Sequence, residues 1–186
     1  METIHDAAFT TDGARVPDRP AEAGGGGRTG RWVLLCYRLP REPSRPRIAV
    51  WRALKRLGVA QLADGLVALP ADARTREQLE WVAEEALEAG GDAAIWLAHP
   101  ASGAQERRLA AGMAAARAAE YLAIVEQAAA AVGLPGRERR RAATRSRAEL
   151  RRVMRRDYFP PAEREAAASA VRGLLVEPAP GEWVAR

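Results

Sequence analysis

Short apolar runs alternate with longer amphipathic segments in the first part of the chain. The run 32–37 is apolar and uncharged, which predicts a strand buried on both faces. Residues 44–57 predict a helix, with Ser44 as its cap and Gly58 as its stop. Asp64-Gly65 separates two further apolar runs, a sequence typical of a two-residue hairpin. The apolar side expected for the helix comprises Ile48, Val50, Trp51, Leu54 and Leu57.

A second helix and a last strand are predicted after the hairpin. Thr75 is followed three residues later by Gln78, which is the pattern of a capping box, and apolar residues then recur at helical spacing up to Leu87. Gly90-Gly91 ends this helix, and the run 93–98 predicts another buried strand. The order strand, helix, strand, strand, helix, strand predicts an α+β fold with a ferredoxin-like βαββαβ domain. With both helices on one face, the other face of the sheet would be free for a partner.

The pattern is helical from Ser102 onward. One long helix is expected over 104–133, a second over 137–156 and a third after Pro160-Pro161. These helices would form an appendage of about three helices, and the pattern leaves open whether it packs on the sheet or pairs in a dimer. The expected organisation is a disordered leader (1–30), a ferredoxin-like α/β domain (31–100), a helical appendage (101–176) and a loose tail (177–186).

The basic composition of the chain favours anionic partners. The net charge is +5 and the pI is near 10.3, with Lys55 as the only lysine among 29 basic residues. Cys36 is the only cysteine, which excludes an internal disulfide and a cysteine-based metal cluster and fits a cytoplasmic location. No apolar run approaches the ~20 residues that a membrane span requires, so no membrane partner is expected.

Two basic segments are candidates for binding DNA or another anion. The second of them, 137–156, holds ten arginines, and guanidinium groups at helical spacing can neutralise phosphates or a small dianion. Alternatively, this helix is solvated and shields an alanine-rich interface. Trp51, which lies among the positive charges of the first segment, is expected to pack in the core. The candidate contact residues are Arg45, Arg47, Arg52, Lys55 and Arg56 in the first segment, and Arg141, Arg145, Arg152 and Arg156 in the second.

Few residues favour catalysis. The sequence GGGGRTG lacks both the lysine and the following helix of a phosphate-binding loop. The two histidines are too few for a histidine metal cluster, and Cys36 is expected to be buried and inert in its strand. Catalytic residues, a metal site and a cofactor are therefore not predicted. Asp157 follows Arg155 and Arg156, and it either caps the next helix, pairs with one of these arginines, or forms with them a site that senses an oxyanion.

Several segments resemble a known family. The sequence LPREPSRPRIAVWRALKRLG, followed by ADGLVALP, resembles the N-terminal domain of ChrB, a family of bacterial regulators of chromate-resistance operons. The similarity continues through TREQLEWVAEEALEAGGDAAIW and is weaker at AAEYLAIVEQ and RRVMRRDYF. It implies a DNA-binding repressor that leaves its operon when chromate or a similar oxyanion binds. Complete members carry a further C-terminal chromate-resistance domain, which these 186 residues lack, so we expect sensing to reside elsewhere or the chain to be a stand-alone member with a different task.

The predicted α/β unit is also similar to the C-terminal part of PaaX-type repressors and to small CRISPR adaptation nucleases. Those nucleases hold metal with an aspartate at the end of their first strand, where this chain has Tyr37-Arg38. Metal-dependent cleavage of nucleic acid is therefore not expected. The leading hypothesis is a homodimeric DNA-binding regulator. The alternatives are an accessory protein-interaction module and a small enzyme with a pocket between sheet and appendage.

Deleting residues 1–27 is expected to leave the melting temperature nearly unchanged, because this segment has no pattern that could form a core. Thermal unfolding of the shortened and full chains, followed by circular dichroism, checks this. A large fall in melting temperature would show that the segment packs on the rest of the protein.

Overall fold

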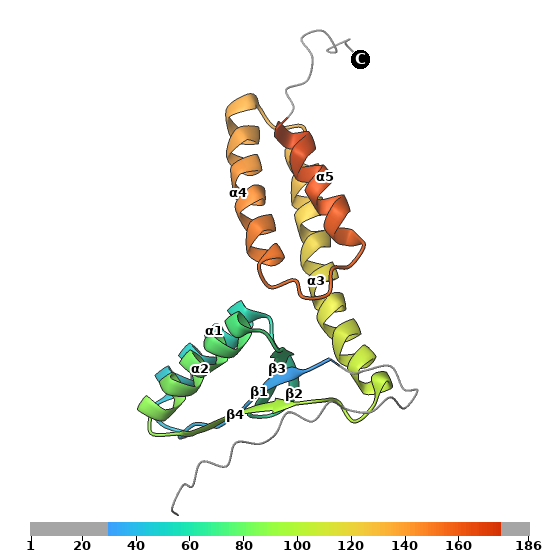
Figure 1. The fold of residues 1–186 in the computed structure, drawn as a ribbon. Helices are drawn as coiled ribbons and strands as arrows, with labels where there is room; N and C mark the ends of the chain where they lie inside the picture. Colours follow the sequence, from blue (N-terminus) through green and yellow to red (C-terminus); the bar gives the residue numbers. More distant parts are fainter. Residues whose placement is uncertain (1–29, 176–186) are drawn as a thin grey trace, which may run out of the picture.

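The computed structural model describes residues 30–175, which form a four-stranded sheet, two helices packed on it and three helices that extend away from it (Figure 1). The predicted leader, apart from Gly30, and the predicted tail lie outside the described residues. The elements are β1 (Trp32–Arg38), α1 (Ser44–Leu57), β2 (Ala60–Ala63), β3 (Leu66–Pro70), α2 (Ala73–Glu88), β4 (Asp92–Ala98), α3 (Gly103–Ala131), α4 (Gly136–Met154) and α5 (Glu163–Leu175).

The strands lie in the order β2-β3-β1-β4, and every neighbouring pair is antiparallel. Leu35 on β1 is opposite both Val67 on β3 and Ile95 on β4, so β1 and β3 form the middle of the sheet. The α+β class and the predicted order of the first six elements are confirmed. The hairpin at Asp64-Gly65 is also confirmed, and Gly65 has a φ of 72°, which favours glycine.

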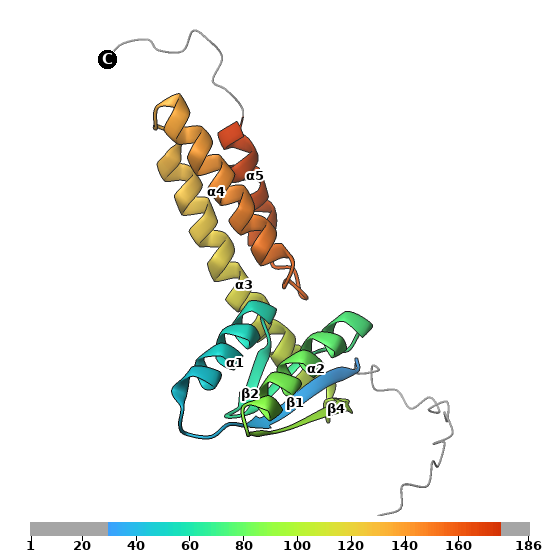
Figure 2. The same ribbon diagram turned by 90° about the vertical axis from the view of Figure 1, so that its left-hand side faces the viewer.

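The main core lies between the sheet and the helices α1 and α2 (Figure 2). Val33 and Leu35 alternate along β1 toward this side and are completely buried, as are Val67 and Leu69 on β3. Burying one such side chain stabilises the fold by about 1.5–3 kcal/mol. The helices contribute Val50, Ala53 and Leu54 from α1 and Leu79, Val82 and Ala83 from α2.

The opposite face of the sheet is covered only at one end. Trp32 is buried there beneath the first turns of α3, and its indole N–H donates to Glu106 Oε1 at 3.3 Å. Further along this face Cys36 is exposed, and Trp96 on β4 is 62% exposed. The predictions that β1 and β4 are fully buried, and Cys36 with them, were therefore wrong, because α3 does not reach this part of the sheet.

The buried side of α1 differs from the predicted one. Val50 and Leu54 are buried as expected, but Ile48 is 45% exposed and Trp51 is 54% exposed. Ser44 is the first helical residue and not the cap, since Pro43 occupies the cap position without a side-chain hydrogen bond. The predicted stop is confirmed, because Gly58 ends the helix in the left-handed conformation with a φ of 71°.

The capping box of α2 lies three residues earlier than predicted. Asp72 is the cap, and its carboxylate accepts a hydrogen bond from the Thr75 backbone N–H at 2.6 Å. The Thr75 hydroxyl in turn accepts one from the Asp72 backbone N–H at 3.0 Å and donates to the Pro70 carbonyl at 2.7 Å. Thr75 is thus the buried third residue of the capping box and not its cap, so the capping box predicted from Thr75 and Gln78 was wrong. The hydrogen bond from Thr75 lowers the pKa of the Asp72 carboxyl.

Helices α3, α4 and α5 pack against one another beyond the sheet (Figures 1 and 2). Near the sheet, Tyr121, Ile124 and Val153 form a core, and farther away the contacts are mostly between alanines. Small side chains let the helix axes approach closely, so this arrangement uses the alanine-rich composition of the segment. None of the helices between residues 30 and 175 is long and apolar enough to cross a membrane.

Replacing Asp72 by alanine is expected to lower the free energy of unfolding by about 1 kcal/mol at pH 7, because the cap is lost. The folded state lowers the pKa of Asp72, so its charge stabilises the protein above the unfolded-state pKa of about 3.9, and this contribution is lost as the pH falls through the folded-state pKa. Urea unfolding at pH 7 and at pH 3 measures both effects. As a control, Asp72→Asn keeps the acceptor oxygen without the charge. A difference between wild type and Asp72→Asn that does not shrink at low pH would contradict the charge contribution.

Candidate nucleic-acid interface

The basic side chains of α1 all point to solvent. Arg45, Arg47, Arg52, Lys55 and Arg56 are exposed, as expected for residues that contact a polyanion. Trp51 lies among them and not in the core, so the prediction of core packing was wrong. Its neighbours Val50, Ala53 and Leu54 fill the buried side of the helix, which leaves the indole outside. The Lys55 ammonium lies 4.5 Å from the centre of the Trp51 ring, a favourable cation–π contact.

A hollow of about 780 Å³ lies between α1 and the β2–β3 hairpin. Trp51, Arg47 and Arg52 line it from the helix, and Asp64 and Gly65 line it from the turn. An exposed ring beside guanidinium groups can stack on a nucleic-acid base while the charges contact the backbone. This hollow is thus the place on α1 where an aromatic and a cationic contact are available together.

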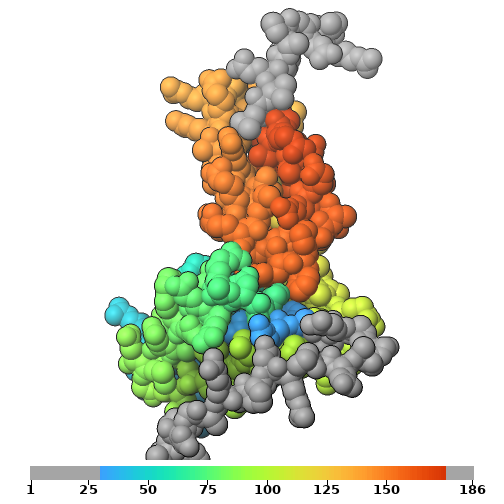
Figure 3. All heavy atoms as spheres, in the orientation of Figure 1, coloured from blue at the N-terminus to red at the C-terminus, as the bar shows by residue number. Residues whose placement is uncertain are grey.

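The second basic surface runs along α4. Arg141 and Arg145 are exposed and lie with Arg137 and Arg140 around a shallow hollow of about 450 Å³. Their spacing continues along the same side of the helix to Arg152. Figures 2 and 3 show that α4 lies above the helices of the sheet, with its C-terminal end directed toward them. The opposite side of α4 carries Ala142, Ala143, Leu150 and Val153 into the bundle.

The two basic surfaces meet where α1 and α4 both end. A cleft of about 310 Å³ is formed there, and five arginines from α1, α2, α4 and the turn that follows α4 line it. Glu149 pairs with Arg152 and Glu120 pairs with Arg156, so the positive charge of the cleft exceeds its negative charge and an anion beside the other arginines would be favoured. Arg74 was not predicted, because nothing in the sequence shows that the start of α2 lies beside the end of α4. The arginines are Arg56, Arg74, Arg152, Arg155 and Arg156.

Arg156 joins the two basic helices to each other. Its Nη1 donates to the Lys55 carbonyl oxygen of α1 at 2.9 Å, and its Nη2 donates to Glu120 of α3 at 2.7 Å. The Arg156 side chain is only 17% exposed. Of the predicted DNA-contacting residues, Arg156 is therefore held inside the junction, whereas Arg141, Arg145 and Arg152 are exposed.

Asp157 lies inside the bundle. Its side chain is fully buried and accepts a hydrogen bond from the Tyr121 hydroxyl at 2.8 Å, with Arg164 Nη1 at 3.5 Å from the same oxygen. Burial and the Asp157 carboxylate raise the pKa of the Tyr121 hydroxyl. The structure therefore places the Asp157 carboxylate with Tyr121 and Arg164, whereas Arg155 and Arg156 line the cleft.

Arg117 is a buried charge that the sequence analysis missed. It is 9% exposed, and its Nη2 lies 2.9 Å from Glu120. Burial lowers the pKa of Arg117, and the Glu120 carboxylate opposes this effect. The sequence does indicate this burial, because Arg117 lies four residues after Met113 and four before Tyr121, on the apolar side of a long helix.

Gly58 allows the close approach of Arg117 to the end of α1. A Cβ atom at this position would lie 2.5 Å from Arg117 Nη1, and the left-handed backbone also disfavours any side chain. Between residues 30 and 175, no group of three or more histidine, cysteine, aspartate and glutamate side chains is placed to hold a metal ion.

Part of the chain matches a known protein family. The family described as Protein ChrB, N-terminal, matches residues 47–132, which extend from the first turn of α1 to the end of α3. The match thus includes α1 from Arg47 onward and the buried Arg117, whereas Arg45, β1, α4 and α5 lie outside it. No curated protein and no solved structure gives a significant match.

Replacing Arg156 by methionine is expected to lower the free energy of unfolding by about 1.5–3 kcal/mol, because the charged hydrogen bonds of a largely buried guanidinium to α1 and α3 are lost. The adjacent Arg155→Met removes the same charge from an exposed side chain and should cost less than about 0.5 kcal/mol. Urea unfolding of the two variants checks the difference. Equal stability of the variants would contradict the role of Arg156 in the junction.

Proposed function

We propose that the chain is a DNA-binding transcriptional regulator of the ChrB type, because residues 47–132 match the family described as Protein ChrB, N-terminal. The observation that carries this proposal is the meeting of the basic surfaces of α1 and α4 in one cleft lined by five arginines. Repression of an operon that responds to chromate or a similar oxyanion follows from the family resemblance. The same proposal predicts a cytoplasmic location and a homodimer.

The size of the basic surface fits a DNA backbone. The helix α4 has 19 residues and α1 has 14, which correspond to lengths of ~28 Å and ~21 Å. Double-stranded DNA carries one negative charge per ~1.7 Å of its axis, so a surface of this length meets several phosphates. Arginine suits this contact because its planar guanidinium group can bind two phosphate oxygens at once.

Phosphate contacts position a protein on DNA but carry no sequence information. Under this proposal, the residues of the hollow beside α1 contact the bases directly. Trp51 provides an aromatic ring there, and Arg47 and Arg52 provide hydrogen-bond donors. Arginine is the commonest side chain that reads guanine in the major groove. We expect variants of Trp51 to affect base preference and variants of α4 to affect overall affinity.

We also infer that residues 31–100 form a ferredoxin-like domain and 101–176 a helical appendage. The order β4-β1-β3-β2 supports this, because β3 lies between β1 and β2 while β1 lies between β3 and β4, so that two strand–helix–strand units interlock. The packing of α3, α4 and α5 on one another supports the separation of the appendage.

A second candidate is an accessory protein-interaction module. The observation that favours it is the exposed apolar patch on the sheet face that α3 leaves uncovered, where Trp96 on β4 is 62% exposed and lies opposite the half-buried Leu34 on β1. Exposed apolar patches of this kind often mark interfaces with other proteins. Failure to bind DNA at low salt would favour this candidate over the regulator.

Replacing Arg52 and Arg56 together by alanine is expected to weaken DNA binding about tenfold or more and to reduce the slope of log K against log salt by about 2, because two phosphate contacts are lost. A gel-shift titration on the DNA upstream of the gene at two salt concentrations measures the affinity and the salt slope. The same titration with and without chromate tests whether chromate releases the DNA. The matched control is Arg107→Ala with Arg172→Ala, which removes the same charge from α3 and α5 outside the basic surface. A salt slope that is unchanged in the α1 variant would contradict the proposal.

A further inference from the structure

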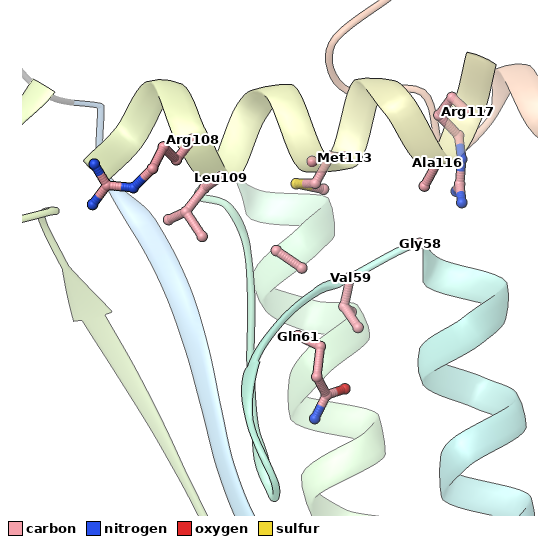
Figure 4. Close-up of a pocket in the computed structure, with 10 residues that line it drawn as sticks. Gly58, Val59, Gln61, Arg108, Leu109, Met113, Ala116 and Arg117 are labelled. Atoms are coloured by element: carbon pink, nitrogen blue, oxygen red, sulfur yellow. The ribbon is translucent and has the colours of Figure 1, made fainter. Parts of the chain in front are cut away.

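A further pocket, adjacent to the arginine cleft but with a different lining, lies between α3 and the segment that joins α1 to β2 (Figure 4). Its volume is about 310 Å³. Val59, Leu109 and Met113 give it an apolar lining. Figure 4 shows Arg108 at one end and Arg117 at the other, and the nine helical steps from one to the other correspond to ~13 Å.

Arg117 has unused hydrogen-bonding capacity at its end of this pocket. Glu120 pairs with Nη2, whereas Nε and Nη1 are buried and have no hydrogen-bond partner among residues 30–175. The Nη1 atom faces Gly58, which itself lines the pocket. Buried donors of a charged group without an acceptor cost free energy, so an anionic acceptor at this position would be strongly favoured.

We propose that this pocket binds a small organic carboxylate, with the carboxylate accepting a hydrogen bond from Arg117 and the apolar part of the ligand lying over Met113, Leu109 and Val59. A pocket with a mainly apolar lining and a few placed polar groups is typical of small-molecule sites. An inorganic oxyanion would contact Arg117 but leave the apolar lining in water, which is why an organic acid fits better. This binding does not depend on whether the protein binds DNA.

Gly112 provides a variant that blocks the pocket without changing Arg117. It lines the pocket from α3, and a Cβ atom there would meet no atom within 4 Å. Leucine in place of Gly112 should fold, because leucine is the better helix former, and its side chain should occupy the pocket. Gly173→Leu is the matched control, since Gly173 is a helical glycine of α5 with equally open space around its Cβ.

Thermal unfolding and calorimetric titration with benzoate and hexanoate test the proposal. The neutral analogues benzyl alcohol and hexan-1-ol, and sulfate as an inorganic anion, are measured in parallel. We expect the two carboxylates to raise the melting temperature of the wild type and of Gly173→Leu with the logarithm of ligand concentration. We expect Gly112→Leu to abolish this shift and Arg117→Met to weaken binding about tenfold or more.

Three results would overturn the proposal. The first is that neither carboxylate binds the wild type at millimolar concentration. The second is that the Gly112→Leu variant binds the carboxylates as tightly as the wild type does. The third is that sulfate binds as tightly as benzoate to both the wild type and Gly112→Leu. The third result would assign Arg117 to a simple inorganic-anion contact. The Gly112→Leu variant keeps the ion pair of Arg117 with Glu120, so it tests the pocket even if the Arg117→Met variant does not fold.

Discussion

The capping of α1 by the segment that follows α4 is the interaction on which the arrangement of this protein depends. The last carbonyl groups of a helix have no partner within the helix. Here Arg156 donates to the Lys55 carbonyl at 2.9 Å, and the Tyr158 hydroxyl donates to the Leu57 carbonyl at 3.1 Å. A guanidinium at a helix C-terminus is also favoured by the helix dipole. The adjacent Phe159 stacks on Trp32, with ring centres 5.9 Å apart, and this contact joins the same segment to the sheet.

This junction brings charges together in one network, in which Arg117, Arg156 and Asp157 are largely buried and Glu120 and Arg164 are partly exposed. Two carboxylates and three guanidinium groups take part, so the positive charge is not fully balanced within the protein. Burying charged groups costs several kcal/mol per ion unless each finds partners. Within the part of the chain that the structure describes, unused donors remain on both Arg117 and Arg156, and one Asp157 carboxylate oxygen also has no hydrogen-bond partner. The network comprises Arg117, Glu120, Arg156, Asp157 and Arg164, with the Tyr121 hydroxyl as a further donor.

Features set by a few neighbouring residues could be predicted from the sequence. The αL cap at Gly58, the turn at Asp64-Gly65 and the order of strands and helices all depend on local patterns. The exposure of Trp51 could not be predicted in this way, because the smaller Ala53 occupies the place in the core that the helical pattern also allowed for the indole. The exposure of Trp96 depends on how far α3 extends across the sheet, and the sequence of β4 does not determine the position of α3.

The candidate site was predictable in its composition but not in its geometry. Both basic segments are evident from their arginines, and the structure places them end to end. The contribution of Arg74 and the withdrawal of Arg156 into the junction depend on contacts between residues far apart in the chain. Arg117 interrupts an apolar pattern, and such an interruption is a signal that deserves the same weight as a run of charges.

The hold of Arg156 on α1 has a mechanical consequence for the proposed complex. It keeps the arginines of α1 and α4 at a set separation, so that a duplex touching both must follow the path that the protein surface prescribes. DNA resists bending, and the work of bending depends on the flexibility of its base-pair steps. Sequences that curve readily along this path would bind more tightly than stiff ones. The protein could thus distinguish operators by their elasticity at base pairs that no side chain touches.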